Sequence, residues 1–177
     1  VIGGSGGAGS ASTLGSADVI NGGAGTDTMK ITTEGATVGG LTVTPNLASM
    51  EKVEVQALTT TGTTVNMVNA TGTTEIWNVR STDALTVNNT QELAAVAANG
   101  LTGQNYTVNF KDTLVAGTAD TVSVVLDSAT VAALKVGGQT TGGFETVNLT
   151  AKAGKSDVTG AFDTNFTTNT GTKTINI

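Results

Sequence analysis

A three-residue motif, Thr-Val-Asn or Thr-Ile-Asn, recurs along the chain and restricts its fold more than any other feature. The motif occupies residues 64–66, 86–88, 107–109, 146–148 and 174–176. Its central valine stands at positions 65, 87 and 108 in the first three copies, so these copies recur at a nearly constant interval. Another strand-like run, at residues 75–79, lies about halfway between the first two copies. Strands at this regular spacing predict a β-solenoid, in which each rung stacks on the next.

The composition also favours strands and tight turns over helices. The chain of 177 residues has 24 glycines, one proline and 3% aromatic residues, and threonine makes up roughly a fifth of it. β-Branched residues are enriched in strands, and glycine is enriched in turns. We therefore expect an all-β protein with a parallel or mixed β-solenoid. An antiparallel β-sandwich is the alternative, because Thr-Val-Asn arises easily by chance in a chain so rich in threonine.

Two stretches of the chain share a second sequence pattern. Residues 50–55 and 144–149 share the pattern apolar-Glu-x-Val-x-apolar and each opens a strand-like run, which suggests two related stretches with an insertion between them.

The insertion contains the one segment that predicts a helix. Residues 91–98 are expected to be helical, with Asn89 or Thr90 as the N-cap and Gly100 as the terminator. Residues 128–134 are expected to add a second, shorter helical turn.

The first 35 residues differ in composition from the rest. Gly, Ala, Ser and Asp dominate them, whereas short alternating strands rich in threonine follow. We expect two continuous segments: residues 1–35 with glycine-rich turns of the β-roll type, and residues 36–177 as the solenoid body. The chain begins without methionine and in the middle of a repeat pattern, so we expect it to be a fragment of a longer protein.

The most specific motif lies in the first segment. Residues 22–30, Gly-Gly-Ala-Gly-Thr-Asp-Thr-Met-Lys, match the nonapeptide G-G-x-G-x-D-x-U-x at every defined position, where U is a large apolar residue. The glycines permit a tight turn, Asp27 supplies a hard carboxylate oxygen, and Met29 anchors the strand that follows. Calcium accepts six to eight oxygen ligands with tolerant geometry. This motif therefore predicts a calcium-binding turn.

A degenerate copy of the motif precedes it in the same phase. Asp18 stands nine residues before Asp27, within residues 13–21, but the leading glycines of this copy are replaced. Because one nonapeptide supplies only part of a coordination shell, a neighbouring turn must complete it. The alternative is that Gly22-Gly23 forms an ordinary turn and that Asp27 is a solvated acid.

Residues 13–31, together with the Glu-x-Val strands, resemble the repeats-in-toxin (RTX) class of calcium-binding proteins, in particular its surface-layer (S-layer) and large adhesin members. By position, the resemblance implies calcium ligation by the Asp18 and Asp27 carboxylates and by the backbone oxygens of Gly22, Gly23 and Gly25. It further implies type I secretion, calcium-dependent folding outside the cell, and self-association into a lattice at the bacterial cell surface.

Several function classes are disfavoured by residues that the chain lacks. It has no histidine, which removes the commonest general base, and no cysteine, which removes thiolate metal sites and disulfides. A net charge of -6 and the lack of a basic stripe argue against nucleic acid as a partner. No apolar run is long enough for a transmembrane helix. The matches to G-x-G-x-x-G and G-x-S-x-G near Ser5 are products of a glycine-rich composition. We therefore expect no enzymatic activity.

Two other groups of residues leave alternatives open. Trp77 and Tyr106 are nearly the only candidate sugar platforms, and Trp77 is expected to serve core or inter-strand packing instead. Five further carboxylates are expected in loops, as turn caps more than as additional calcium ligands: Asp112, Asp120, Asp127, Asp157 and Asp163. The leading hypothesis is a structural calcium-binding segment of an S-layer-like protein. An adhesin domain that binds a surface or host glycan is the alternative, and a polysaccharide lyase or hydrolase on a β-helix is the third.

Overall fold

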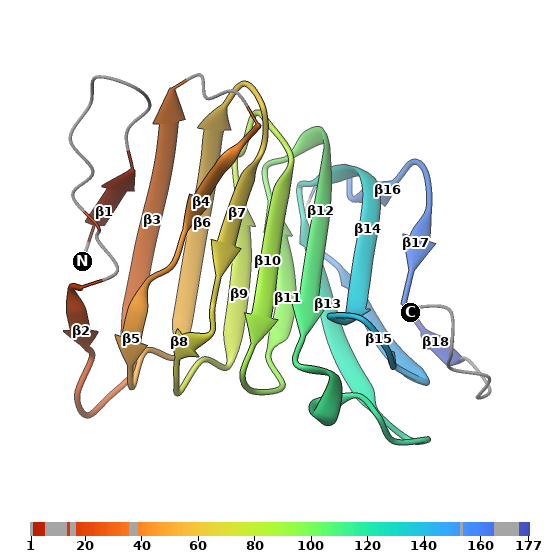
Figure 1. Ribbon diagram of the computed structural model, residues 1–177. Helices are drawn as coiled ribbons and strands as arrows, with labels where there is room; N and C mark the ends of the chain where they lie inside the picture. The colour runs from red at the N-terminus through yellow and green to blue at the C-terminus, as the bar shows by residue number, and fades with distance from the viewer. Residues whose placement is uncertain (1, 6–13, 15–16, 36–38, 153, 165–173) are drawn as a thin grey trace.

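The protein folds into an all-β, parallel β-solenoid of about six turns, which a computed structural model describes for residues 2–5, 14, 17–35, 39–152, 154–164 and 174–177 (Figure 1). Every strand pair in these residues is parallel, so the predicted solenoid is confirmed and the antiparallel sandwich is wrong.

Three parallel sheets form the walls of the solenoid. The eight-stranded sheet contains, in order, β1 (Ile2–Ser5), β3 (Thr28–Gly35), β6 (Lys52–Thr59), β9 (Glu75–Val79), β11 (Ala95–Asn99), β13 (Thr121–Asp127), β15 (Thr146–Ala151) and β18 (Thr174–Asn176). The seven-stranded sheet contains β4 (Leu41–Val43), β7 (Thr63–Asn66), β10 (Leu85–Thr90), β12 (Thr102–Phe110) and β14 (Thr130–Gly138), with β16 (Asp157–Val158) and β17 (Phe162–Asp163) both paired to β14. The three-stranded sheet contains β2 (Val19–Asn21), β5 (Asn46–Ala48) and β8 (Asn69–Ala70).

The Thr-Val-Asn copies stack on one another as their spacing predicts. In the seven-stranded sheet, Val65 pairs with Val87, and Val87 pairs with Val108. The last two copies stack in the other large sheet, where Val147 pairs with Ile175. The first three copies therefore occupy one position on successive rungs of the seven-stranded sheet, and their period is the length of a rung, whereas the last two copies occupy a different position, on the eight-stranded sheet.

Columns of apolar side chains fill the narrow space between the two large sheets. One column, from the eight-stranded sheet, is fully buried over five successive rungs: Met29, Val53, Ile76, Val96 and Val124. The facing column from the seven-stranded sheet is all valine: Val43, Val65, Val87, Val108 and Val136. Since alternate residues of a strand point to opposite faces, neighbours of the columns such as Lys30, Glu54 and Thr64 lie on the outside.

Both predicted helices are wrong. Residues 91–94 form an irregular connection and Ala95–Asn99 form β11, which pairs with β9 on one side and β13 on the other. Asn89 adopts a φ of 56° and so turns the chain instead of capping a helix. A run of alanines and valine suits either a helix or a buried strand, and here the two neighbouring ladders decide in favour of the strand.

Residues 128–134 likewise contain no helical turn. Ser128 has a φ of 51°, and β14 begins two residues later at Thr130. The one helical element among the described residues is a single 3₁₀ turn, Asp112–Leu114, in the connection from β12 to β13.

Candidate metal-binding turn

The nonapeptide forms the turn that carries the chain from β2 to β3, with residues 22–27 between the two strands. Gly23 and Gly25 have φ values of 87° and 123°, a region that favours glycine. The Asn21 Oδ1 atom accepts a hydrogen bond of 3.0 Å from the Gly23 amide, which tightens the start of the turn. Met29 is fully buried in the core, so its predicted anchoring role is confirmed.

Gly22 is required by close packing and not by its backbone angles. A Cβ atom at this position would lie 2.1 Å from the Ser49 carbonyl oxygen and 2.7 Å from the Asp27 Cβ. The Gly22 amide also donates a 2.9 Å hydrogen bond to the Ala48 carbonyl on the next rung. The turn is therefore pressed against both its own aspartate and the neighbouring rung.

Asp27, which immediately precedes β3, contacts a second acidic residue, Glu51, which immediately precedes β6 on the next rung. We call such a contact between two residues at the starts of successive strands a corner. The Asp27 amide donates a 2.8 Å hydrogen bond to Glu51 Oε2, and the Asp27 carbonyl accepts a 3.0 Å bond from the Lys52 amide. The Asp27 Oδ2 atom is buried and has no hydrogen-bond partner. A buried carboxylate oxygen without a donor is costly, and a cation satisfies such an oxygen.

The same corner occurs a second time, at Asp120 and Glu145. The Asp120 amide donates a 2.8 Å hydrogen bond to Glu145 Oε2, and the Asp120 carbonyl accepts a bond of 3.1 Å from the Thr146 amide. The two corners differ at the aspartate side chain, because Asp120 Oδ2 accepts a 2.9 Å hydrogen bond from the Gly117 amide. The repeated apolar-Glu-x-Val pattern therefore marks the places where a glutamate side chain accepts a hydrogen bond from the backbone amide of an aspartate on the preceding rung.

Asp18 lies away from this corner. It is exposed and immediately precedes β2, whereas Asp27 packs against Gly22 just beyond the other end of that strand. Four extended residues span about 13 Å, so Asp18 and Asp27 belong to different turns. Residues 13, 15 and 16 of the degenerate copy lie outside the described residues.

The oxygen donors around Asp27 fit a hard cation only in part. Within the described part of the chain, no three acidic, histidine or cysteine side chains come together. A calcium ion at this corner would draw on Asp27 Oδ2, the Glu51 carboxylate and backbone carbonyls of the glycine turn, which are the oxygen types that calcium accepts. Sequence reasoning missed Glu51 as a partner, although its pattern match to Glu145 and its offset of 24 residues from Asp27 were available signals.

The other predicted carboxylates divide between turns and strands. Asp112 lies in a turn and accepts hydrogen bonds from the amides of Thr140 and Thr141 and from the Thr140 hydroxyl, so it caps a turn of the next rung. Burial raises the pKa of Asp112, but these hydrogen bonds outweigh it, so the net pKa is lowered. The loop placement is wrong for three others, because they lie within β13, β16 and β17: Asp127, Asp157 and Asp163.

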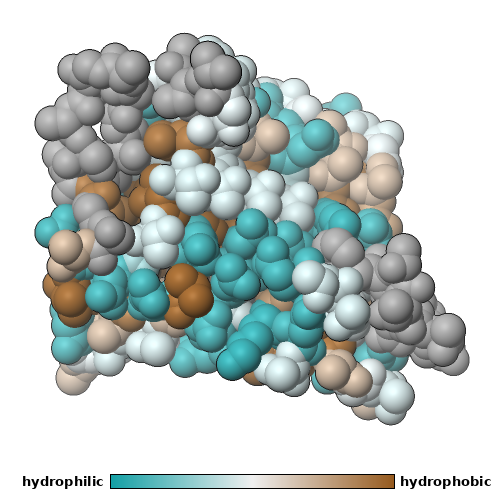
Figure 2. Space-filling model, in the orientation of Figure 1, coloured by the Kyte–Doolittle hydropathy of each residue, from teal (hydrophilic) through white to brown (hydrophobic). Residues whose placement is uncertain are grey.

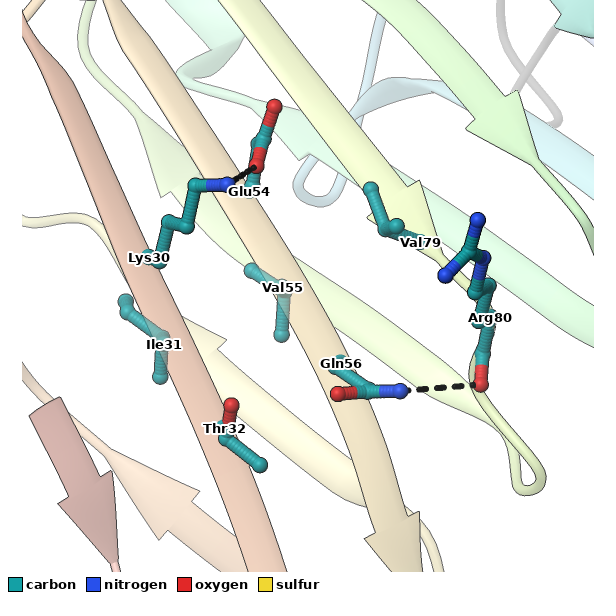
Figure 3. A pocket seen from close by; sticks show the side chains of 8 residues that line it. All are labelled: Lys30, Ile31, Thr32, Glu54, Val55, Gln56, Val79 and Arg80. Atoms are coloured by element: carbon teal, nitrogen blue, oxygen red, sulfur yellow. Dashed lines mark hydrogen bonds and ion pairs between the residues drawn. The ribbon is translucent and has the colours of Figure 1, made fainter. Parts of the chain in front are cut away.

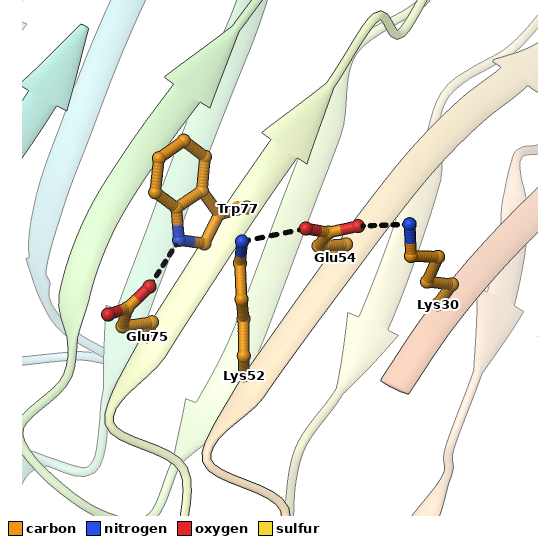
Figure 4. Close-up of polar contacts among 5 residues, drawn as sticks. All are labelled: Lys30, Lys52, Glu54, Glu75 and Trp77. Carbon is orange, nitrogen blue, oxygen red and sulfur yellow. Dashed lines mark hydrogen bonds and ion pairs between the residues drawn. The ribbon is translucent and has the colours of Figure 1, made fainter. Parts of the chain in front are cut away.

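The outer face of the eight-stranded sheet carries a chain of charged contacts (Figure 4). Glu54 forms ion pairs with Lys30 at 3.1 Å and with Lys52 at 2.7 Å. Burial raises the pKa of Glu54, but hydrogen bonds and attraction from Lys52 and Lys30 outweigh this and leave the pKa lowered. Glu54 also borders a shallow depression that reaches Arg80 (Figure 3).

Trp77 lies on this outer face and not in the core. Its indole Nε1 donates a 2.7 Å hydrogen bond to Glu75, and the Lys52 Nζ atom sits 4.4 Å from the ring centroid, with Lys152 at 5.9 Å. Trp77 therefore packs between neighbouring strands, and its ring is already engaged by ammonium groups. Tyr106 is fully buried, with its hydroxyl donating to the Ile76 carbonyl, so it is not a sugar platform.

No protein-family model, no curated protein and no solved structure matches this chain. Searching the described residues for a helix long and apolar enough to cross a membrane finds none.

Proposed function

We propose that this chain is a non-enzymatic, calcium-stabilised structural segment of a secreted, S-layer-like bacterial surface protein. The observation that carries the proposal is the unpartnered, buried Asp27 Oδ2 beside Glu51, in a turn whose sequence matches the calcium-binding nonapeptide. The matched corner at Asp120 has the same backbone contacts but supplies its carboxylate with an amide donor. Of the two aspartates, Asp27 is the one with a buried carboxylate oxygen that has no hydrogen-bond partner.

Calcium at this corner would couple to folding of the first rungs. The Asp27 carboxylate and the Glu51 carboxylate come from successive rungs, so an ion between them ties one rung to the next. A ligand that binds only the folded state stabilises it by about 2.7 kcal/mol when its concentration is 100 times the dissociation constant. The folded solenoid would then be less stable in low calcium and more stable at the higher calcium concentration outside the cell, which suits a secreted structural element.

Calorimetry with millimolar calcium and with chelator tests the proposal. For a chain of this size, about 2.7 kcal/mol corresponds to a rise in Tm of about 5 to 11 °C with calcium. Asp27→Asn should lose that rise, while Asp120→Asn, the matched control at the other corner, should keep it. Equal melting temperatures of the unmodified protein with calcium and with chelator would refute the calcium hypothesis.

Lattice formation is the second part of the proposal and has its own test. Electron microscopy of the purified protein should show ordered sheets after calcium is added, and soluble monomers only in chelator. Monomers in both conditions would remove the lattice role and leave calcium-dependent stability as the whole function.

An adhesin segment that binds a surface or host glycan is the second candidate. It is favoured by Trp77, whose half-buried ring lies on the outer face and not in the core. A glycan array probed with the native chain and with Trp77→Ala separates the two candidates, because only a glycan-binding chain should give signals that the substitution removes.

A further inference from the structure

The outer face of the seven-stranded sheet carries a straight column of threonines. Successive strand pairings place Thr42 beside Thr64, Thr64 beside Thr86, and Thr86 beside Thr107. Each threonine lies between two inward-facing residues of its own strand, so all four side chains point outward. Neighbouring strands are about 4.7 to 4.9 Å apart, so the hydroxyl and methyl groups repeat at that interval. The column ends at β14, where Lys135 pairs with Thr107.

A second column, of asparagines, runs parallel to the first. Asn66 pairs with Asn88 two residues beyond the threonines, and Asn109, which is buried, continues the stack behind Asn88 where the ladder between β10 and β12 shifts its register. The Asn109 side chain donates a 2.7 Å hydrogen bond to Asn88, and Asn89 donates a 2.9 Å bond to Asn66, so these side chains are fixed along the stack. Two residues of a strand span about 6.6 Å, which sets the distance between the columns.

The two columns form a surface without charged residues. Strands β4, β7, β10 and β12 contain no Asp, Glu, Lys or Arg, whereas the opposite sheet carries the Lys30, Glu54 and Lys52 network. In Figure 2 a pale band and a teal band run side by side across this face, over the strands nearest the viewer in Figure 1. Threonine is restricted at χ1, and the parallel pairing places one threonine beside the next, so the pattern repeats from rung to rung.

A surface of this kind suits a ligand whose hydrogen-bonding groups repeat at the same interval as the strands. Each threonine hydroxyl both donates and accepts a hydrogen bond, but a single exposed hydroxyl binds weakly. A small ligand meets only one or two of these groups, whereas a crystalline lattice with a similar repeat meets all of them at once, and the weak contacts then add. Because no charge lies on the four strands that carry the columns, the lattice must be neutral.

We propose that the face made by the threonine column (Thr42, Thr64, Thr86, Thr107) and the two partly exposed asparagines beside it (Asn66, Asn88) binds ice. Ice is a neutral lattice in which oxygen atoms repeat at intervals close to the spacing of β-strands, and each oxygen donates and accepts hydrogen bonds as threonine does. The regular methyl groups between the hydroxyls exclude disordered water, and the hydroxyl and amide groups hold the remaining water at fixed intervals. This inference is independent of calcium binding at Asp27.

The test is the freezing behaviour of the full chain in calcium-containing buffer. The protein should open a gap between the melting and freezing points in a nanolitre osmometer and should shape ice crystals into facets. Thr86→Lys places a charge at the centre of the column and should abolish both effects. Thr150→Lys makes the same change at an exposed threonine on β15, on the opposite sheet, and should leave both effects intact. Circular dichroism of both variants shows whether each remains folded.

Three outcomes would overturn the inference. One is a native chain that produces neither a gap nor faceted crystals. Another is a loss of equal size in folded Thr86→Lys and Thr150→Lys. The third is sedimentation with crystalline cellulose or chitin that Thr86→Lys removes, with no effect on ice, because the face would then recognise a neutral polysaccharide.

Discussion

Replacing Gly22 by alanine gives the sharpest test of how the nonapeptide turn is built. The added Cβ would lie 2.1 Å from the Ser49 carbonyl oxygen and 2.7 Å from the Asp27 Cβ, so backbone and not a flexible side chain would have to move. Overpacking of this kind costs about 1 to 3 kcal/mol, and displacement of the Gly22 amide from the Ala48 carbonyl removes a hydrogen bond worth about 1 kcal/mol. We expect a total loss of about 2 to 4 kcal/mol.

Gly23 provides the matched control, because it lies in the same turn but in open space. No atom lies within 4 Å of the position that a Cβ would take, and the φ of 87° is the only source of strain. A left-handed conformation costs an alanine about 1 to 2 kcal/mol. Gly23→Ala should therefore be milder than Gly22→Ala, although glycine at position 23 has the more unusual backbone angle.

Thermal unfolding followed by far-UV circular dichroism measures both effects. A change of about 1 kcal/mol shifts Tm by about 2 to 4 °C in a chain of this size, so Gly22→Ala should lower Tm by about 4 to 16 °C. Gly23→Ala should lower it by about 2 to 8 °C. If Gly22→Ala melts with the native protein, or above Gly23→Ala, the close approach of the turn to the Ser49 carbonyl is not what requires glycine there.

Two further predictions concern the outer ion pairs and the core. The pKa of Glu54 is lowered below its ordinary value of 4.5 by Lys52 and Lys30 despite burial, so the pairing stabilises the fold above that pH and is lost as pH falls through the lowered pKa. Denaturant titrations should show that Glu54→Gln flattens the decline in stability below about pH 4.5, and an unchanged decline would show that the ion pairs contribute nothing. Val87→Ala opens a gap in the fully buried valine column and should lower the free energy of unfolding by about 2 kcal/mol, whereas Val68→Ala, at a side chain that is 47% exposed, should change it by less than about 0.5 kcal/mol.

The stacking of the solenoid could be predicted from sequence because it depends on periodicity alone. Val65, Val87 and Val108 recur at the rung length, and stacked strands bury them in one column. The later rungs could not be predicted in this way, since Val96 pairs with Val124, which is farther along the chain than the period of the motif predicts. The longer connection between β12 and β13 increases the sequence distance between paired strands, although the strands keep their parallel register.

The errors have a common physical cause, which is that contacts from other rungs override local preference. Alanines at residues 94–98 favour a helix locally, but β9 and β13 offer backbone partners on both sides. The partner of Asp27 was missed for the same reason, because Glu51 is 24 residues away and only the stack brings the two together. Trp77 was expected in the core or between strands, and it lies between strands on the outer face, because no sequence signal gave the side of the sheet to which it points.

The unequal rung lengths bear on how a chain of this kind can change through evolution or engineering. In the eight-stranded sheet Glu75 pairs with Ala95, whereas Val96 pairs with Val124, so the second of these rungs is the longer one, yet both pairs stay in parallel register. The extra residues leave the walls through the connection that contains the Asp112–Leu114 turn. That connection is therefore a natural insertion point, where a foreign loop could be displayed at a fixed height along the rod without shifting the strands on either side.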